Sequence, residues 1–65
     1  DAVHLSPGAH LAGNVQVGAG SWIGIGAVVR QGVRIGSRVV VGAGAVVLND
    51  VPDDATVVGV PARSR

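Results

Sequence analysis

The chain contains no cysteine, methionine, phenylalanine, tyrosine or lysine, and Trp22 is its one large aromatic residue. The absence of cysteine excludes a disulfide scaffold and a zinc–thiolate site. Without phenylalanine, tyrosine and methionine, a conventional globular core would be thin in a chain of 65 residues. We therefore expect the fold to draw its stability from a repeating architecture, from a partner, or from both.

Charge and long apolar runs are scarce as well. Glycine, arginine or aspartate interrupts every apolar stretch within a few residues, so we expect no membrane span and no signal segment. Five arginines face four aspartates, which leaves a formal net charge of +1. Binding of nucleic acid favours clustered cations with stacking aromatics, whereas the arginines are spread out here. We expect no nucleic-acid partner.

What the chain does have is a repeat of six residues. Branched aliphatic residues recur at every sixth position, and a small or β-branched residue lies two positions before each of them. This spacing is typical of a short strand with one buried face. We call the aliphatic positions anchors; they are Leu5, Leu11, Val17, Ile23, Val29, Ile35, Val41 and Val47.

A turn residue follows each anchor by three positions. Glycine, asparagine and aspartate tolerate a positive φ at least cost, so this position predicts a tight corner. Arg38 is the exception, and we expect backbone strain or a different turn there. A helix is excluded because a six-residue period does not match 3.6 residues per turn. The turn positions are Gly8, Asn14, Gly20, Gly26, Gly32, Arg38, Gly44 and Asp50.

The repeat predicts an all-β fold, a three-sided parallel β-solenoid in which each coil uses three hexads and the anchors stack into a dry column. Residues 1–52 would form about three coils of this β-helix. Pro52 cannot donate to a ladder, and residues 53–65 are expected to form a C-terminal cap and an extended tail. Because Asp1 already falls inside a hexad, we expect a fragment of a longer protein.

His4 and His10 are the candidates for acid–base chemistry, since both lie one residue before an anchor and should point outward. Ordinary surface histidines explain such a pair about as well. Their spacing and the lack of a third ligand predict no metal site. Trp22 follows His4 by eighteen residues and should stack directly above it. An exposed tryptophan favours a subunit contact over a ligand contact.

The glycine pairs around Ala19, Ile25 and Ala43 invite comparison with a phosphate-binding loop. None extends to G-x-G-x-x-G, and no helix follows to supply a dipole. We interpret them as corner glycines that leave backbone N–H and C=O groups open to an extended ligand.

The hexads Ile23-Gly24, Ile35-Gly36 and Val41-Gly42 resemble those of the hexapeptide-repeat acyltransferases. This resemblance implies a left-handed parallel β-helix assembled as a homotrimer. The segment His4-Leu5-Ser6-Pro7-Gly8-Ala9 and the tail Val58-Gly59-Val60-Pro61-Ala62-Arg63 are similar to one branch, the sialic-acid and bacillosamine-pathway type of sugar O- and N-acetyltransferases. The resemblance to this branch implies a cytoplasmic enzyme that uses acetyl-CoA to acetylate a sugar or nucleotide sugar.

The same resemblance implies a cofactor-binding site. His4 matches a residue beside the thioester end of acetyl-CoA. Ile25 and Ala43 match corner residues whose backbone lines the pantetheine channel, with Gly24 and Gly42 next to them. Steps of eighteen residues place Pro7, Ile25 and Ala43 on one edge of the prism.

The resemblance does not assign a catalytic residue. In that branch the base is a histidine followed directly by an acidic residue, whereas His4 and His10 are each followed by leucine. The N-terminal nucleotide-sugar domain of the branch is also missing, so we expect the cofactor-binding part of a site. Arg63 and Arg65 are candidates for the phosphates of the cofactor, and a solvated terminus explains them equally well.

Two alternatives remain open. The first alternative is a purely structural, trimerising module without activity. The second is a metal-dependent solenoid resembling carbonic anhydrase. The second needs three histidine ligands, and the chain has two. Binding of acetyl-CoA distinguishes an acetyltransferase from the structural module, and a metal assay tests the second alternative.

Overall fold

The computed structural model describes residues 3–64, so Asp1 and Arg65 lie outside the described residues. Residues 3–64 form ten short strands and no helix, and therefore contain no helix able to cross a membrane. The strands are β1 (His4–Leu5), β2 (His10–Leu11), β3 (Gln16–Val17), β4 (Trp22–Ile23), β5 (Val28–Val29), β6 (Arg34–Ile35), β7 (Val40–Val41), β8 (Val46–Val47), β9 (Thr56–Val58) and β10 (Arg63–Ser64).

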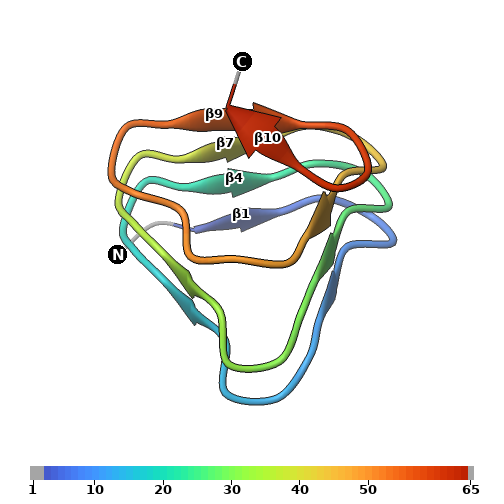
Figure 1. The fold of residues 1–65 in the computed structure, drawn as a ribbon, viewed down its shortest axis with the longest axis horizontal. Coiled ribbons are helices and arrows are strands. Elements are labelled where there is room, and N and C mark those ends of the chain that lie inside the picture. The colour runs from blue at the N-terminus through green and yellow to red at the C-terminus, as the bar shows by residue number, and fades with distance from the viewer. Residues whose placement is uncertain (1–2, 65) are drawn as a thin grey trace.

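The strands wind into a three-sided prism (Figure 1). One side carries β1, β4, β7, β9 and β10, the second carries β2, β5 and β8, and the third carries β3 and β6. Strands of successive coils pair in parallel, with His4 opposite Trp22 and Trp22 opposite Val40. In Figure 1 the chain runs clockwise as it winds towards the viewer, which is a left-handed coil. The predicted β-helix is confirmed.

The anchors form the core, as predicted. From the second coil onward they are at most 1% exposed: Ile23, Val29, Ile35, Val41 and Val47. Leu5, at the N-terminal end of the column, is 54% exposed. The residues two positions before the anchors fill the space between them, since Ala27, Val39 and Ala45 are fully buried. Burial of this apolar column is the main stabilising contribution to the fold.

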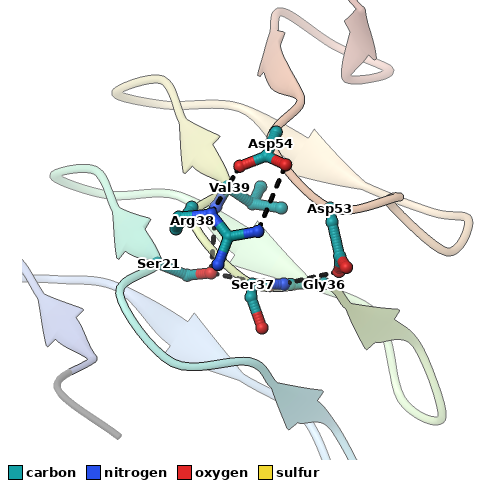
Figure 2. Close-up of polar contacts among 7 residues, drawn as sticks. All are labelled: Ser21, Gly36, Ser37, Arg38, Val39, Asp53 and Asp54. Atoms are coloured by element: carbon teal, nitrogen blue, oxygen red, sulfur yellow. Dashed lines mark hydrogen bonds and ion pairs between the residues drawn. The ribbon is translucent and has the colours of Figure 1, made fainter.

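Ser21 is the one buried polar residue in the column of residues 3–64. Its hydroxyl donates to the Gly36 carbonyl at 2.7 Å and accepts from the Val39 amide at 3.1 Å. Both partners belong to the next coil, as Figure 2 shows. At other corners the equivalent amide and carbonyl bond directly, as Ala27 does to Gly24, so the buried Ser21 hydroxyl bridges a pair that no longer bond to each other.

The corners follow the predicted pattern at seven of the eight positions. Their φ angles are positive, including 62° at Asn14 and 56° at Arg38, so the strain expected at Arg38 is present. Asp50 is different, because its φ is not positive and its carboxylate accepts the Arg34 amide at 2.9 Å. The prediction of a regular corner at Asp50 is wrong because the last coil is shorter.

The last coil is two residues shorter than the others. Val51 bridges Ile35 sixteen positions earlier, whereas Ile35 pairs with Val17 eighteen positions earlier. The corner of this coil lies at Asp54, where φ is 64°. Beyond it, β9 pairs in parallel with β7 and buries Val57 against the column.

The tail folds back as a hairpin. After Gly59, with φ of 91°, and a cis peptide bond between Val60 and Pro61, β10 pairs antiparallel with β9. The hairpin also reaches the second side of the prism, because the Ala62 amide donates to the Val46 carbonyl at 2.7 Å. The expected extended tail is thus a strand paired over the end of the solenoid.

Candidate functional site

One edge of the prism is formed by the corners that follow β1, β4 and β7. Pro7, Ile25 and Ala43 stack along it, as the eighteen-residue steps predict. The Gly26 amide donates to the Pro7 carbonyl at 3.2 Å, and the Gly44 amide donates to the Ile25 carbonyl at 2.8 Å. We call this row of three residues the Ile25 edge. Ile25 is 62% exposed, so the middle of the edge is open to solvent.

The Ile25 edge carries backbone amides that the fold does not use. The amides of Gly24 and Gly42 donate to the next coil at 2.8 Å, and those of Gly26 and Gly44 are used as described above. Within residues 3–64, by contrast, the amides of Ile25 and Ala43 donate no hydrogen bond. Two N–H donors on successive coils are therefore available to an extended ligand with acceptors at a matching spacing.

Gly24 and Gly42 have a structural reason to be glycine. A Cβ atom at Gly24 would lie 2.7 Å from the Ala43 nitrogen and from the Val41 oxygen. At Gly42 it would lie 2.9 Å from Cγ1 of Val58. These glycines let successive coils approach closely behind the Ile25 edge. Their part in lining a cofactor channel remains a prediction.

His4 lies at the beginning of the Ile25 edge, three residues before Pro7 on β1. Its imidazole stacks on the indole of Trp22, with ring centroids 4.9 Å apart and an angle of 20° between the planes. The predicted stacking of Trp22 above His4 is confirmed. Trp22 is 51% exposed, and its Nε1–H donates to Oγ of Ser6 at 3.2 Å.

Ser6 was not assigned to this cluster from the sequence alone. A signal was present, because Ser6 lies two residues after His4 and such residues point to the same side of a strand. The bond to Trp22, however, depends on the orientation of the indole, which the spacing does not determine. We call Ser6, Trp22 and His4 the stacked cluster.

His10 does not join the stacked cluster. It lies on β2, on the neighbouring side of the prism, and is paired with Val28. The two histidines therefore occupy different sides. Among residues 3–64, no three histidine, cysteine, aspartate or glutamate residues gather to hold a metal ion.

Two open hollows lie away from the Ile25 edge. One of about 480 Å³ lies between Arg30, Gln31 and Asn49, and one of about 290 Å³ lies beside Gln16, Arg34 and Asp53. Neither contains a predicted site residue. The Ile25 edge is convex, and a groove along it requires a second surface beside it.

The C-terminal coil is attached by carboxylates (Figure 2). Asp53 accepts the Ser37 amide at 2.8 Å, and Asp54 binds the Arg38 guanidinium through both oxygens at 2.6 and 3.2 Å. The hydrogen bond, more than the charge, raises the pKa of Arg38 and lowers the pKa of Asp54. Arg63 is exposed on β10 opposite Val58, while Arg65 lies outside the described residues.

A left-handed prism of hexads whose coils pair in parallel defines a hexapeptide-repeat β-helix domain. Residues 14–49, more than half of the 65, match the family model for the bacterial transferase hexapeptide, which comprises six repeats. The chain therefore belongs to the bacterial hexapeptide transferase family.

Relatives with solved structures are acetyltransferases. The chain is 54% identical to the acetyltransferase domain of PglB from Neisseria gonorrhoeae and superposes on it with a TM-score of 0.96. The match covers 97% of this chain and 31% of the PglB chain. It is 48% identical to PerB from Caulobacter crescentus, with a TM-score of 0.94 over 95% of this chain and 30% of that one.

A curated relative of known sequence has a different acceptor in its name. The chain is 50% identical over 61 residues to a serine acetyltransferase of Buchnera aphidicola. The aligned residues make up 94% of this chain and 16% of that protein. The chain thus spans less than a third of the length of these three relatives.

Proposed function

We propose that the chain is the acetyl-CoA-binding β-helix portion of an enzyme that transfers acetyl to an amine or hydroxyl of a sugar or nucleotide sugar. The observation that carries this proposal is the likeness to the PglB domain, at 54% identity and a TM-score of 0.96. That domain has also been solved in complex with acetyl coenzyme A. The PerB structure holds CoA and GDP-perosamine.

The Ile25 edge suits the pantetheine arm of the cofactor. Pantetheine is an extended chain with two amide groups, and the free N–H groups of Ile25 and Ala43 can donate to carbonyl acceptors along such a chain. His4, at the beginning of the edge, then lies at the thioester end. Gly24 and Gly42 keep the backbone of the two corners close together.

The reaction follows from the thioester. A base takes the proton from the sugar amine or hydroxyl, and the electron pair on that atom attacks the thioester carbonyl. The C–S bond then breaks, and the departing thiolate takes up the proton to give free CoA. The described residues supply binding and orientation. The histidine–acid pair expected for the base is not among them, and the nucleotide-sugar domain belongs to the remainder of such an enzyme.

We further propose that the enzyme is a homotrimer in the cytoplasm, the compartment that supplies acetyl-CoA. The convex Ile25 edge needs a neighbouring surface to form a groove. Exposed apolar side chains suited to a subunit contact are present at Trp22, Val28 and Val40, which are 51%, 39% and 45% exposed. Closed cyclic symmetry would cover one such surface on every subunit.

Calorimetry of the full-length protein with acetyl-CoA tests the proposal. Ala43→Trp fills the groove and is expected to abolish binding, whereas Gln31→Ala, on another edge, leaves it unchanged. Undiminished affinity of the Ala43→Trp protein would place the site elsewhere. Assays with nucleotide-linked amino sugars and with neutral sugars separate transfer to nitrogen from transfer to oxygen, and light scattering tests the trimer.

A further inference from the structure

Trp22 is attached to the first coil at two points. Its indole covers one side of the His4 imidazole at 4.9 Å, and its Nε1–H donates to Oγ of Ser6 at 3.2 Å. His4 and Ser6 are alternate residues of the same stretch, so the indole spans both of them from the coil above. Two contacts in different directions restrict both side-chain torsions of the tryptophan.

The attachment point at Ser6 is rigid. The Ser6 amide donates to the Ile23 carbonyl at 3.0 Å, and the Ser6 carbonyl accepts the Ala9 amide at 3.1 Å. The hydroxyl therefore projects from a backbone that is held on both sides. The backbone of His4 is held in the same way, since its amide donates to the Ser21 carbonyl at 3.0 Å. Its side chain differs from that of Ser6, because no hydrogen bond within residues 3–64 holds the imidazole. The indole is the contact that restrains this ring.

From this arrangement we infer that Trp22 and Ser6 are positioning residues for His4. Ser6 fixes the indole, and the indole holds the imidazole at the beginning of the Ile25 edge. The inference rests on the proposed function, in which His4 lies beside the thioester of acetyl-CoA. Neither Trp22 nor Ser6 needs to touch the cofactor, since both act through the orientation of the histidine ring.

The test is a double-mutant cycle on acetyl-CoA affinity in the full-length protein. Because an aromatic pair contributes modestly beyond its buried area, Trp22→Ala is expected to weaken binding roughly two- to tenfold. Trp22→Phe, which keeps a ring but loses the bond to Ser6, should recover part of that loss. The loss should vanish in the His4→Ala background, because Trp22 then has no ring to hold. Gln16→Ala, at an outward strand position on the third side of the prism, is the control and should leave affinity unchanged.

A spectroscopic measurement follows the ring itself. In the free wild-type protein, the ring current of the indole should move the His4 carbon-bound proton resonances upfield. Trp22→Ala should remove that displacement, and Ser6→Ala should reduce it. Retention of the full displacement in the Ser6→Ala protein would overturn the part assigned to Ser6.

The outcomes separate this inference from the proposed function. If the wild type does not bind acetyl-CoA, the proposed function fails and the positioning of His4 for that cofactor fails with it. If His4→Ala weakens binding and Trp22→Ala does not, the positioning inference alone is overturned. Equal losses on Trp22→Ala with and without His4 overturn it as well, because they would reflect a contact of Trp22 with a neighbouring subunit or with the ligand.

Discussion

Arg38 and Asp54 form a bidentate ion pair across successive coils. Both residues have a positive φ and occupy corresponding corners of the two coils. The hydrogen bonds of Arg38, ahead of its charge, hold the pKa of Asp54 below its ordinary value. Both side chains are more than 60% exposed, at 64% and 63%, so the pair is screened and contributes little energy. It nevertheless joins the shortened last coil to the regular coil below it.

The pH dependence of this pair has a definite sign. A carboxylate with a lowered pKa stabilises the folded state above the unfolded pKa of about 3.9, and this contribution is lost as pH falls through the folded value. Asp54→Asn keeps a residue that tolerates the positive φ and removes the charge. Thermal melts should show the wild type slightly more stable than Asp54→Asn at pH 6, with the difference disappearing as pH falls through the lowered pKa of Asp54 in the folded state. A difference that stays constant over this range would show that the carboxylate charge plays no part.

Ser21 is expected to be essential to the column despite its small size. Ser21→Ala would leave the Gly36 carbonyl and the Val39 amide buried without their partner. The free energy of unfolding should fall by about 1–3 kcal/mol, measured by denaturant titration. Ser37→Ala, whose hydroxyl makes no hydrogen bond within residues 3–64, is the matched control and should cost less than about 0.5 kcal/mol. Equal losses would contradict the bridging role of the Ser21 hydroxyl.

Two glycines of different surroundings test the close approach of the coils. Gly24→Ala would place a methyl group 2.7 Å from backbone atoms of the next coil, and should destabilise the fold by about 1–3 kcal/mol. Gly13 has no heavy atom within 4 Å of such a methyl group and no positive φ. Gly13→Ala should therefore be neutral, or should stabilise the fold by about 0.4–1 kcal/mol because alanine lowers the conformational entropy of the unfolded chain. The measurement is chemical unfolding of both variants, and a neutral Gly24→Ala would disprove the crowding.

The anchor column is tested by one charge. Ile35 is 1% exposed, so Ile35→Asp buries a carboxylate without a partner and should remove on the order of 5 kcal/mol or more, enough to unfold the chain. Gln31→Asp, at an exposed corner, should be tolerated. Circular dichroism decides between them: similar melting temperatures for the two variants would show that the assignment of inward and outward positions is incorrect.

The free amides of the Ile25 edge allow a conservative test of cofactor binding. Ile25→Pro removes an N–H that donates nothing within residues 3–64, and Pro7 already occupies the corresponding position one coil earlier. The fold should therefore be unchanged, while acetyl-CoA affinity falls roughly three- to tenfold for one lost hydrogen bond.

Two further variants complete that experiment. Ile25→Ala keeps the backbone N–H but removes most of the side chain. It therefore distinguishes the contribution of the amide to binding from that of the side chain. Gln31→Pro removes an equally unused amide on another edge and should leave affinity unchanged. Unaltered binding by the Ile25→Pro protein would show that this amide does not contact the cofactor.

The repeat of the anchors made most of the architecture predictable, because each buried position repeats one local rule. The step of eighteen residues was enough to place Trp22 above His4 and Ile25 above Pro7. The corner at Asp50 was not predictable in this way, because the aspartate side chain takes the Arg34 amide and the coil closes two residues early. Short-range propensity favours a corner at any aspartate, and only the tertiary pairing excludes it.

The site was predictable to a smaller extent. Spacing identifies the edge that holds Ile25 and Ala43, but which amides remain free depends on how the coils bond to each other. Gly24 and Gly42 donate their amides to the next coil, and Gly26 and Gly44 donate theirs to the preceding coil. The open donors therefore belong to the two residues with side chains. Ser6 joined the stacked cluster through a rotamer of Trp22, which no sequence period specifies.

The hairpin of β9 and β10 determines where the solenoid stops. A coil that ended at β9 would present unpaired N–H and C=O groups to solvent, and such a strand edge is a template for another chain. β10 pairs with that edge on one side of the prism, and the Ala62 amide reaches Val46 on the next. The edge of β9 therefore cannot add a strand from another copy of the protein, so end-to-end stacking through this edge is blocked.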